Sequence, residues 1–219
     1  MSCGSRDIQA HFARWAATYD WTVQKPRGIL AEVFDGYEAI LAEVVKRVKG
    51  KARTVVDVGA GTGNLSLKCI EAGLMVTAVD PSPEMRELAR VKLPPGTEIL
   101  AGDFLHLPLP DGGADALVST WAFHHVPDEL KGEAVQEVVR VLRPDGMVVM
   151  ADTAYESEEA RDRIHERLVS EGKLDWLYEL QAEYYPVLPT VASAFQRAGW
   201  EAAFTRLNRW VWLWEAKHA

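Results

Sequence analysis

The sequence predicts an α/β fold built on a doubly wound, mostly parallel β-sheet. From about Arg53 onward, short apolar runs alternate with segments of helical periodicity. The apolar runs are nearly continuous rather than alternating, which is typical of strands that are buried on both faces of a parallel sheet. With 219 residues, the chain is long enough to bury a full core, and we expect one domain over residues 1–219.

The N-terminal part, residues 1–50, is expected to consist of helices. Residues 11–20 and 29–48 place apolar side chains at helical spacing, so we expect two helices that pack on the sheet or over its mouth.

The expected cofactor-binding core, residues 51–155, contains five of the expected strands. These strands are residues 53–58, 75–80, 97–103, 115–120 and 146–152. Helices are expected at Asn64–Ala72, Pro83–Lys92 and Asp128–Leu142, and the last one should end at the turn sequence "RPDG".

The remaining segments are an expected helical insertion at residues 156–199 and a terminal hairpin at residues 200–219. Helical patterns from Ser157 to Gly199 are interrupted by glycine and proline, and we interpret this stretch as a lid. The last two strands are joined so tightly at Asn208 that they must be antiparallel to each other, which makes one edge of the sheet mixed. Three tryptophans near the final strand, Trp210, Trp212 and Trp214, are interpreted as core.

Composition limits the partners that the chain can have. The net charge of −8 argues against nucleic acid or an anionic membrane as the main partner, because either would favour a basic surface. The sequence shows no signal peptide, no apolar stretch of membrane-spanning length and no CxxC spacing between its two cysteines. We therefore expect a cytoplasmic protein, and the sequence leaves open whether it is a monomer or a homodimer.

A glycine-rich loop is the first sign of a ligand site. Asp57, Gly59, Gly61 and Gly63 form D-x-G-x-G-x-G between an expected strand and an expected helix. Glycines there allow unusual backbone dihedrals and a close approach of backbone N–H groups to a ligand. The spacing matches neither the G-x-G-x-x-G dinucleotide pattern nor a phosphate-binding G-x-x-x-x-G-K-[ST] loop.

Acidic residues also end the next two strands. Asp80, about twenty residues after the loop, is placed to accept hydrogen bonds from the two hydroxyls of a ribose. Asp103 and Phe104 follow the third strand, where an acid that accepts from an exocyclic amine suits adenine. Singly, Asp80 could cap the helix that begins near Ser82, and Asp103 could order a turn, but together these residues follow consecutive strands in the order that an adenosine ligand requires.

These motifs resemble those of the class I S-adenosylmethionine-dependent methyltransferases. The four stretches that carry the resemblance are "VVDVGAGTGNLS", "VTAVDPSPEM", "GDFLHLPLPDG" and "DALVSTWAFHHVPD", and they cover roughly Arg53 to Asp152. The additional stretches "RWAATYD" and "FTRLNRWVW" make the chain similar to the YrrT-like branch of small bacterial methyltransferases. The resemblance implies a Rossmann-like sheet of seven strands in the order 3-2-1-4-5-7-6, with strand seven antiparallel.

The resemblance also assigns expected roles to residues around the cofactor S-adenosylmethionine. Gly59 and Gly61 would approach its methionine part, Asp57 would lie near its amino group, Asp80 would hold the ribose, and Asp103 with Phe104 would hold the adenine. Ser119 and Tyr19 fall where members of the family contact or close over the methionine part.

Transfer of the methyl group to an acceptor would leave S-adenosylhomocysteine (SAH). A small-molecule acceptor is expected, because the chain is acidic and lacks the N/D-P-P-[FY]-type tetrapeptide of amino-methylating relatives. Methylation of RNA or protein, or a non-catalytic cofactor-binding regulatory role, remain the alternatives.

The catalytic residues are not identified by the sequence, and His124 and His125 are the candidates for a general base. A phenol, a hydroxyl or a carbon acid needs such a base, whereas a thiolate or a carboxylate does not. We expect no metal, because adjacent histidines project in different directions and no nearby residue completes a ligand set. Tyr184 and Tyr185 could line the acceptor pocket or simply pack in the core.

Overall fold

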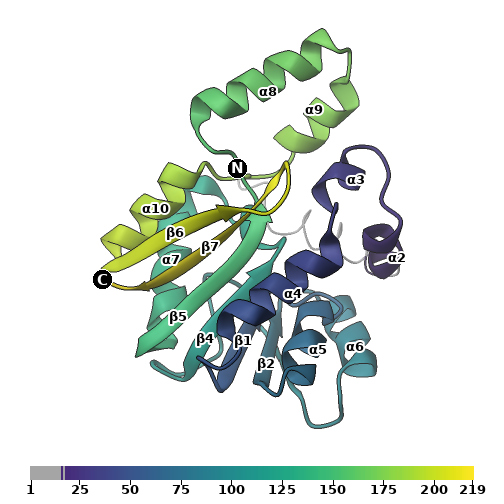
Figure 1. Cartoon of the computed structure of the whole chain (residues 1–219). Helices are drawn as coiled ribbons and strands as arrows, with labels where there is room; N and C mark the ends of the chain where they lie inside the picture. The colour runs from purple at the N-terminus through teal and green to yellow at the C-terminus, as the bar shows by residue number, and fades with distance from the viewer. Residues whose placement is uncertain (1–15, 17) are drawn as a thin grey trace.

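The computed structural model describes Ala16 and residues 18–219 and shows a seven-stranded sheet with helices on both faces (Figure 1). Its strands are β1 (Thr54–Val58), β2 (Met75–Asp80), β3 (Glu98–Ala101), β4 (Ala114–Thr120), β5 (Leu142–Thr153), β6 (Trp200–Arg206) and β7 (Val211–His218). Its helices are α2 (Tyr19–Gln24), α3 (Ile29–Val33), α4 (Tyr37–Val48), α5 (Asn64–Glu71), α6 (Pro83–Lys92), α7 (Lys131–Arg140), α8 (Glu158–Ser170), α9 (Leu174–Gln181) and α10 (Leu188–Arg197).

The strand order confirms the expected topology. The strands lie in the order β3-β2-β1-β4-β5-β7-β6. The pairs from β3 to β5 are parallel, and β7 runs antiparallel to both β5 and β6. The carboxyl ends of β1 to β5 therefore meet at one edge of the sheet, where ligands collect in open α/β folds.

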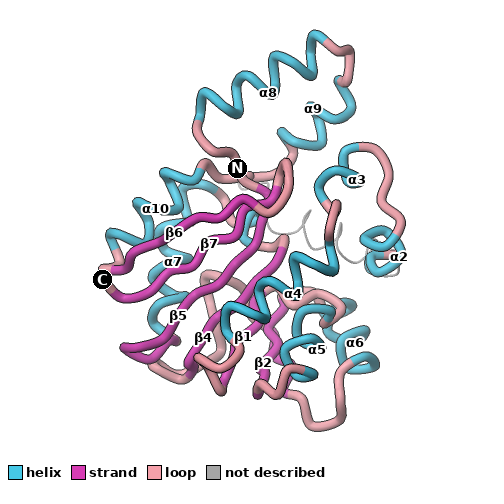
Figure 2. The backbone as a smooth tube through the Cα atoms, in the orientation of Figure 1, coloured by secondary structure: helices cyan, strands magenta, loops and turns pink. Residues whose placement is uncertain are grey.

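The core forms two layers, one on each face of the sheet. Helices α4 and α5 cover one face, and α7 and α10 cover the other (Figure 2). Alternate residues of β1 point into opposite layers, with Val55 in the first and Val56 in the second. As expected, Trp210 and Trp214 are buried core residues, whereas Trp212 is half-buried.

The N-terminal helices are shorter than the sequence suggests. The expected helix over residues 11–20 falls mainly on residues that the structure does not describe. The expected helix over residues 29–48 is divided into α3 and α4, because Gly36 adopts a left-handed conformation with φ of 74° that an α-helix does not accommodate.

Two segments after β4 also differ from expectation. The expected helix from Asp128 begins with a 3₁₀ turn over Asp128–Leu130 before α7. Strand β5 begins at Leu142, and its pairing with β4 shifts in register between Ala114 and Ala116. Within residues 156–199, α8 and α9 extend beyond the end of the sheet, whereas α10 packs against α7 and β6 (Figure 1). Among the described residues, no helix combines the length and the apolar character needed to cross a membrane.

Candidate functional site

The glycine loop connects β1 to α5 and is bound to the end of β2. The backbone N–H groups of Gly59 and Ala60 both donate to the carbonyl oxygen of Val79, at 2.8 and 3.1 Å. The N–H of Gly61 donates to Oδ2 of Asp80 at 2.8 Å. The loop is therefore held in place at the carboxyl edge by the neighbouring strand.

Backbone conformation explains the three loop glycines, and a close contact adds a second reason for Gly59. Their φ angles are 70°, 55° and 87°, in the region that side chains disfavour. A Cβ atom on Gly59 would lie 2.3 Å from Cβ of Ala122, which follows β4. Gly59 thus makes room for the β4 loop, a reason for glycine that is separate from contact with a ligand.

Asp80 is the acid that joins the loop to α6. Its Oδ2 accepts from Gly61 and its Oδ1 accepts from the N–H of Ser82 at 2.9 Å. Ser82, rather than Asp80, caps α6, because its hydroxyl accepts from the N–H of Met85. Burial raises the pKa of Asp80, although the two backbone hydrogen bonds oppose this effect. Since a carboxylate offers about four acceptor positions, Asp80 retains capacity for further donors.

Asp57 is more deeply buried than Asp80 and links β1, which precedes the loop, to α5, which follows it. It is 1% exposed and accepts a hydrogen bond of 2.6 Å from the hydroxyl of Ser66 on α5. Burial raises the pKa of Asp57 to about 7, the Ser66 hydrogen bond opposes that rise, and the charge of Asp80 adds to it.

Asp103 and Phe104 follow β3 at the same edge. Oδ1 of Asp103 accepts from the backbone N–H groups of Leu105 and His106, at 2.8 and 3.0 Å, so this side chain does order a turn. Half of the Asp103 side chain is exposed. The ring of Phe104 is buried edge-on against Phe123, with 5.3 Å between ring centroids.

Ser119 and Tyr19 have different surroundings. The Ser119 hydroxyl donates to the carbonyl oxygen of Val58 at 2.7 Å and fastens β4 to β1. Tyr19, the first residue of α2, lies near Tyr37 and Asp80, and burial together with these neighbours raises its pKa well above the ordinary value. The structure thus brings Tyr19 close to the acid at the end of β2.

A polar network that we did not predict connects α2 to the loop. Oδ1 of Asp20 accepts from the Thr62 hydroxyl at 2.6 Å and from Nδ2 of Asn64 at 3.1 Å. Oδ2 of Asp20 accepts from Nζ of Lys92 at 2.7 Å, and the same ammonium donates to Thr62 and to Asn64. We call these four residues the Asp20 network.

A buried histidine and aspartate pair lies beyond the end of β4. Nδ1 of His124 is 2.6 Å from Oδ1 of Asp152, and the His124 backbone N–H donates to Oδ2 of the same carboxylate at 3.1 Å. Burial alone lowers the pKa of His124, but attraction to Asp152 and the hydrogen bond with it outweigh burial, so the pKa is raised. Asp152 lies at the end of the fifth apolar run, as Asp57 and Asp80 lie at the ends of theirs. This repeated pattern could have identified Asp152 as a site residue from the sequence.

His125 contacts a second carboxylate. Its Nδ1 lies 2.9 Å from Oε2 of Glu183, and its ring centroid lies 4.0 Å from that of His124. Burial and the neighbouring His124 lower the pKa of His125. One potential ligand atom from each of His124, His125 and Glu183 falls within 4.8 Å of the others. Glu183 thus supplies the third side chain that the sequence did not reveal, and the expectation of no metal stays a prediction.

Trp121, between Thr120 and Ala122, has two unusual properties that we did not foresee. Its φ is 48°, and within Ala16 and residues 18–219 no other residue except glycine has a positive φ. Its indole Nε1 is buried and has no hydrogen-bond partner among the described residues. The ring stacks on Tyr37 with 5.1 Å between centroids and an interplanar angle of 23°.

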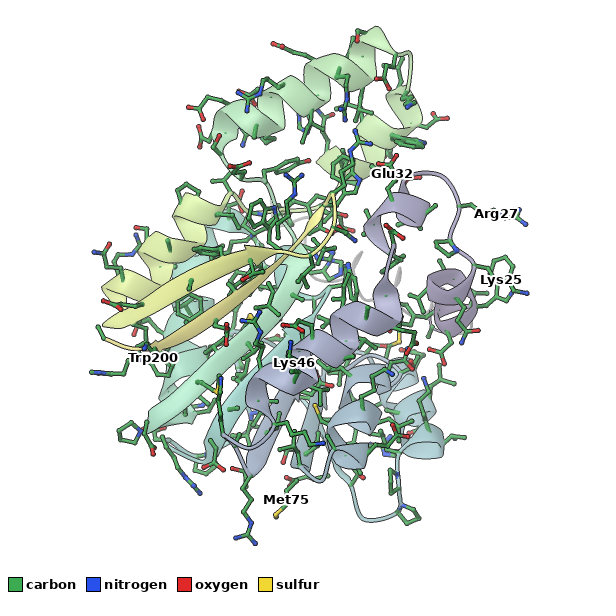
Figure 3. All side chains as sticks on the ribbon, in the orientation of Figure 1. Lys25, Arg27, Glu32, Lys46, Met75 and Trp200 are labelled. Carbon is green, nitrogen blue, oxygen red and sulfur yellow. The ribbon has the colours of Figure 1, made fainter. Side chains whose placement is uncertain are left out.

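Two surface hollows of the described structure lie away from this edge. One is lined by the opposite, amino-terminal ends of β1 and β2, where Met75 projects outward (Figure 3). The other lies between the start of α8 and α10. Neither brings together the acids and histidines described above, so we base the site on those residues.

Comparison with known proteins matches the chain to methyltransferases. The family described as "Methyltransferase domain" matches residues 56–150, from β1 to β5. The uncharacterized methyltransferase YrrT of Bacillus subtilis is 40% identical over 211 residues, which cover 96% of this chain and 98% of that protein. An uncharacterized methyltransferase of Oceanobacillus iheyensis is 39% identical, with 94% and 95% covered.

Solved structures share the fold at lower identity. The magnesium protoporphyrin IX methyltransferase of Synechocystis PCC 6803, solved with bound SAH, superposes with a TM-score of 0.73 at 16% identity. The match covers 97% of this chain and 98% of that one. At this identity the similarity establishes the fold and leaves the substrate open.

Proposed function

Because the chain belongs to this family of methyltransferases, we propose that it transfers the methyl group of S-adenosylmethionine to a small-molecule acceptor and releases SAH. The observation that carries this proposal is the position of Asp80. Its carboxylate ends β2, holds the glycine loop through Gly61 and retains acceptor capacity for ribose hydroxyls.

The residues at the carboxyl edge fit the parts of this cofactor. Asp80 would hold the ribose, and Asp103, half-exposed after β3, would accept from the adenine amine. Gly59, Gly61 and Gly63 would bring the loop against the methionine part. When bound, the cofactor supplies an electrophilic methyl group on a sulfonium. The remaining task of the protein is to orient an acceptor and to exclude water, and orientation can account for roughly 7 to 11 kcal/mol of the barrier.

In this proposal Asp57 and Ser119 support the loop, and Phe104 would lie beside the adenine with Asp103. Asp57 bonds to Ser66, and Ser119 bonds to Val58, so both fix the ends of the strands that carry the loop. Tyr19 would close over the methionine part, since α2 places it near Asp80.

The acceptor side is assigned to the His124 and Asp152 pair. Asp152 binds Nδ1 of His124 and thereby fixes the orientation of the ring. The other ring nitrogen, Nε2, would then face the acceptor. In its neutral form, this nitrogen is able to take a proton from a hydroxyl, phenol or carbon acid as the methyl group arrives. His125, held by Glu183, would shape the same pocket.

A small acceptor is favoured over RNA because of the net charge of −8, which repels a polyanion. We also propose that α8 and α9 act as a lid and that the protein is cytoplasmic. Whether it is a monomer or a homodimer stays open. A protein that binds the cofactor without catalysis is the alternative, and turnover with any acceptor would exclude it.

Calorimetric titration of the purified protein with S-adenosylmethionine, SAH and NAD tests the cofactor assignment. Binding of the first two without NAD is expected. Binding of NAD alone would refute the interpretation of the glycine loop. A panel of thiols, carboxylates and phenols then tests the acceptor, with formation of SAH as the readout.

A further inference from the structure

Trp121 combines two costly features at one position. A left-handed backbone conformation at a bulky residue costs on the order of 1 to 3 kcal/mol. A buried indole N–H without an acceptor adds a further desolvation cost. Structures retain such features when the surroundings demand them, and the ring itself packs in the core between Phe34 and Tyr37, so the packing accounts for the ring but not for the N–H group.

The surroundings of Trp121 place it beside the glycine loop. The next residue, Ala122, fills the space above Gly59. The indole ring stacks on Tyr37, whose hydroxyl accepts from Nδ2 of Asn64 at 3.0 Å, and Asn64 directly follows Gly63. Trp121 therefore approaches the loop where β1 and β4 end, and these strands lie two and three positions away from β3, which Asp103 follows.

The chemistry of the cofactor limits what an N–H group can bind there. A sulfonium and an ammonium accept no hydrogen bond, so the possible acceptors are adenine nitrogens, ribose oxygens and the carboxylate. The adenosine part is assigned to Asp80 and Asp103, which leaves the carboxylate at the β1 and β4 end. The nearby cation Lys92 already donates all three of its N–H groups within the Asp20 network.

We propose that Nε1 of Trp121 binds the carboxylate of the amino-acid part of S-adenosylmethionine and SAH, and that Trp121 is a residue that determines affinity for this end of the cofactor. The inference rests on the proposed function, because it requires the cofactor to occupy the carboxyl edge. Trp121 belongs neither to the glycine loop nor to the acids at the strand ends, so the proposal adds a residue to the cofactor site.

The test compares two ligands that differ only at this end. 5′-Methylthioadenosine keeps the nucleoside and the thioether of SAH but lacks the amino acid. We expect Trp121→Phe, which keeps an aromatic ring and removes the N–H, to raise the Kd of SAH at least about tenfold, as for loss of a hydrogen bond to a charged group. The Kd of 5′-methylthioadenosine should stay unchanged.

Trp214→Phe is the matched control. Trp214 also has a buried indole nitrogen that finds no partner in the part of the chain that the structure describes, but it lies on β7 in the core layer beside Phe123. We expect this variant to keep the affinity for both ligands. If Trp121→Phe keeps the affinity for SAH, or lowers the affinity for both ligands equally, the carboxylate assignment is wrong.

A spectroscopic readout measures the response of the wild-type protein and uses a variant only to assign the resonance. The chain has eight tryptophans, and the indole resonance that disappears in Trp121→Phe identifies Nε1 of Trp121. SAH should shift this proton downfield, whereas 5′-methylthioadenosine should leave it nearly in place. An equal response to both ligands would overturn the inference. Failure of the wild type to bind either ligand would instead refute the proposed function.

Discussion

Asp152 lies 2.6 Å from Nδ1 of His124, with both side chains almost fully buried beyond the end of β4. This pair couples the protonation of the imidazole to a carboxylate on the next strand. Because burial and Asp152 act on the pKa of His124 in opposite directions, replacing the carboxylate should reveal which influence remains.

We expect the pKa of His124 to be raised in the wild type and to fall in Asp152→Asn, where burial acts without the charge and the hydrogen bond of Asp152. The stabilisation from this raised pKa is fully present below about pH 6.5 and is lost as the pH rises through the folded-state pKa. Histidine NMR titration measures the change.

His124→Gln should lower the rate of methyl transfer roughly a hundredfold with an acceptor that must lose a proton, because the general base is removed. With an acceptor that is already a thiolate, the rate should change little. Initial rates of SAH formation with the two acceptor types measure this difference, and equal losses with both would contradict the role of His124 as a base.

Asp80→Ala should weaken binding of SAH by roughly 1 to 3 kcal/mol, because ribose hydroxyls lose a charged acceptor. The variant also releases the N–H groups of Gly61 and Ser82, so part of the loss comes from a looser loop. Calorimetry measures the affinity. An unchanged Kd would refute the ribose site.

Gly59→Ala should destabilise the fold more than Gly73→Ala. Both glycines have positive φ, of 70° and 88°, but a Cβ atom meets Ala122 only at position 59 and has open space at position 73. The common dihedral strain costs about 1 to 3 kcal/mol, and the contact with Ala122 adds to it.

Adding Ala122→Gly to Gly59→Ala separates these two causes. The double variant should recover the part of the loss that comes from the contact and keep the part that comes from the dihedral. Urea unfolding measures all of these variants, and equal losses for Gly59→Ala and Gly73→Ala would contradict the steric explanation.

The buried Asp57 should make stability depend on pH. Its pKa is raised from an ordinary value near 4 to about 7, so the folded state holds a proton that the unfolded state releases in this range. The stabilisation is fully present below about pH 4 and is lost as the pH rises through about 7. In Asp57→Asn, the free energy of unfolding should fall less steeply between pH 4 and 7, as measured by urea unfolding. An unchanged slope would contradict the shifted pKa.

Much of the sheet is predictable because local patterns encode it. Aliphatic runs that end in acids mark β1, β2 and β5, and the tight connection at Asn208 requires an antiparallel hairpin. The break between α3 and α4 was missed because apolar periodicity continues across Gly36, and only the backbone conformation there ends the helix pattern.

The contacts of the candidate site were less accessible from the sequence. Glu183 meets His125 across 58 residues, and Asp20 meets Lys92 across 72 residues. Such pairs are created by the packing of distant helices and leave no local periodicity. The spacing of the loop indicated glycine at position 59, but the contact with Ala122, which follows β4, is a long-range contact that the spacing does not reveal.

The Asp20 network has a kinetic consequence. Since α2 is bonded through Asp20 to Thr62, Asn64 and Lys92, a ligand that bound between α2 and the glycine loop would leave only after these bonds open. Opening would then limit the exchange of spent for fresh cofactor, lengthen the residence time of the product and make turnover sensitive to product accumulation. Asp20 on α2 would thus limit the turnover rate of a reaction whose chemistry takes place at the carboxyl ends of the strands.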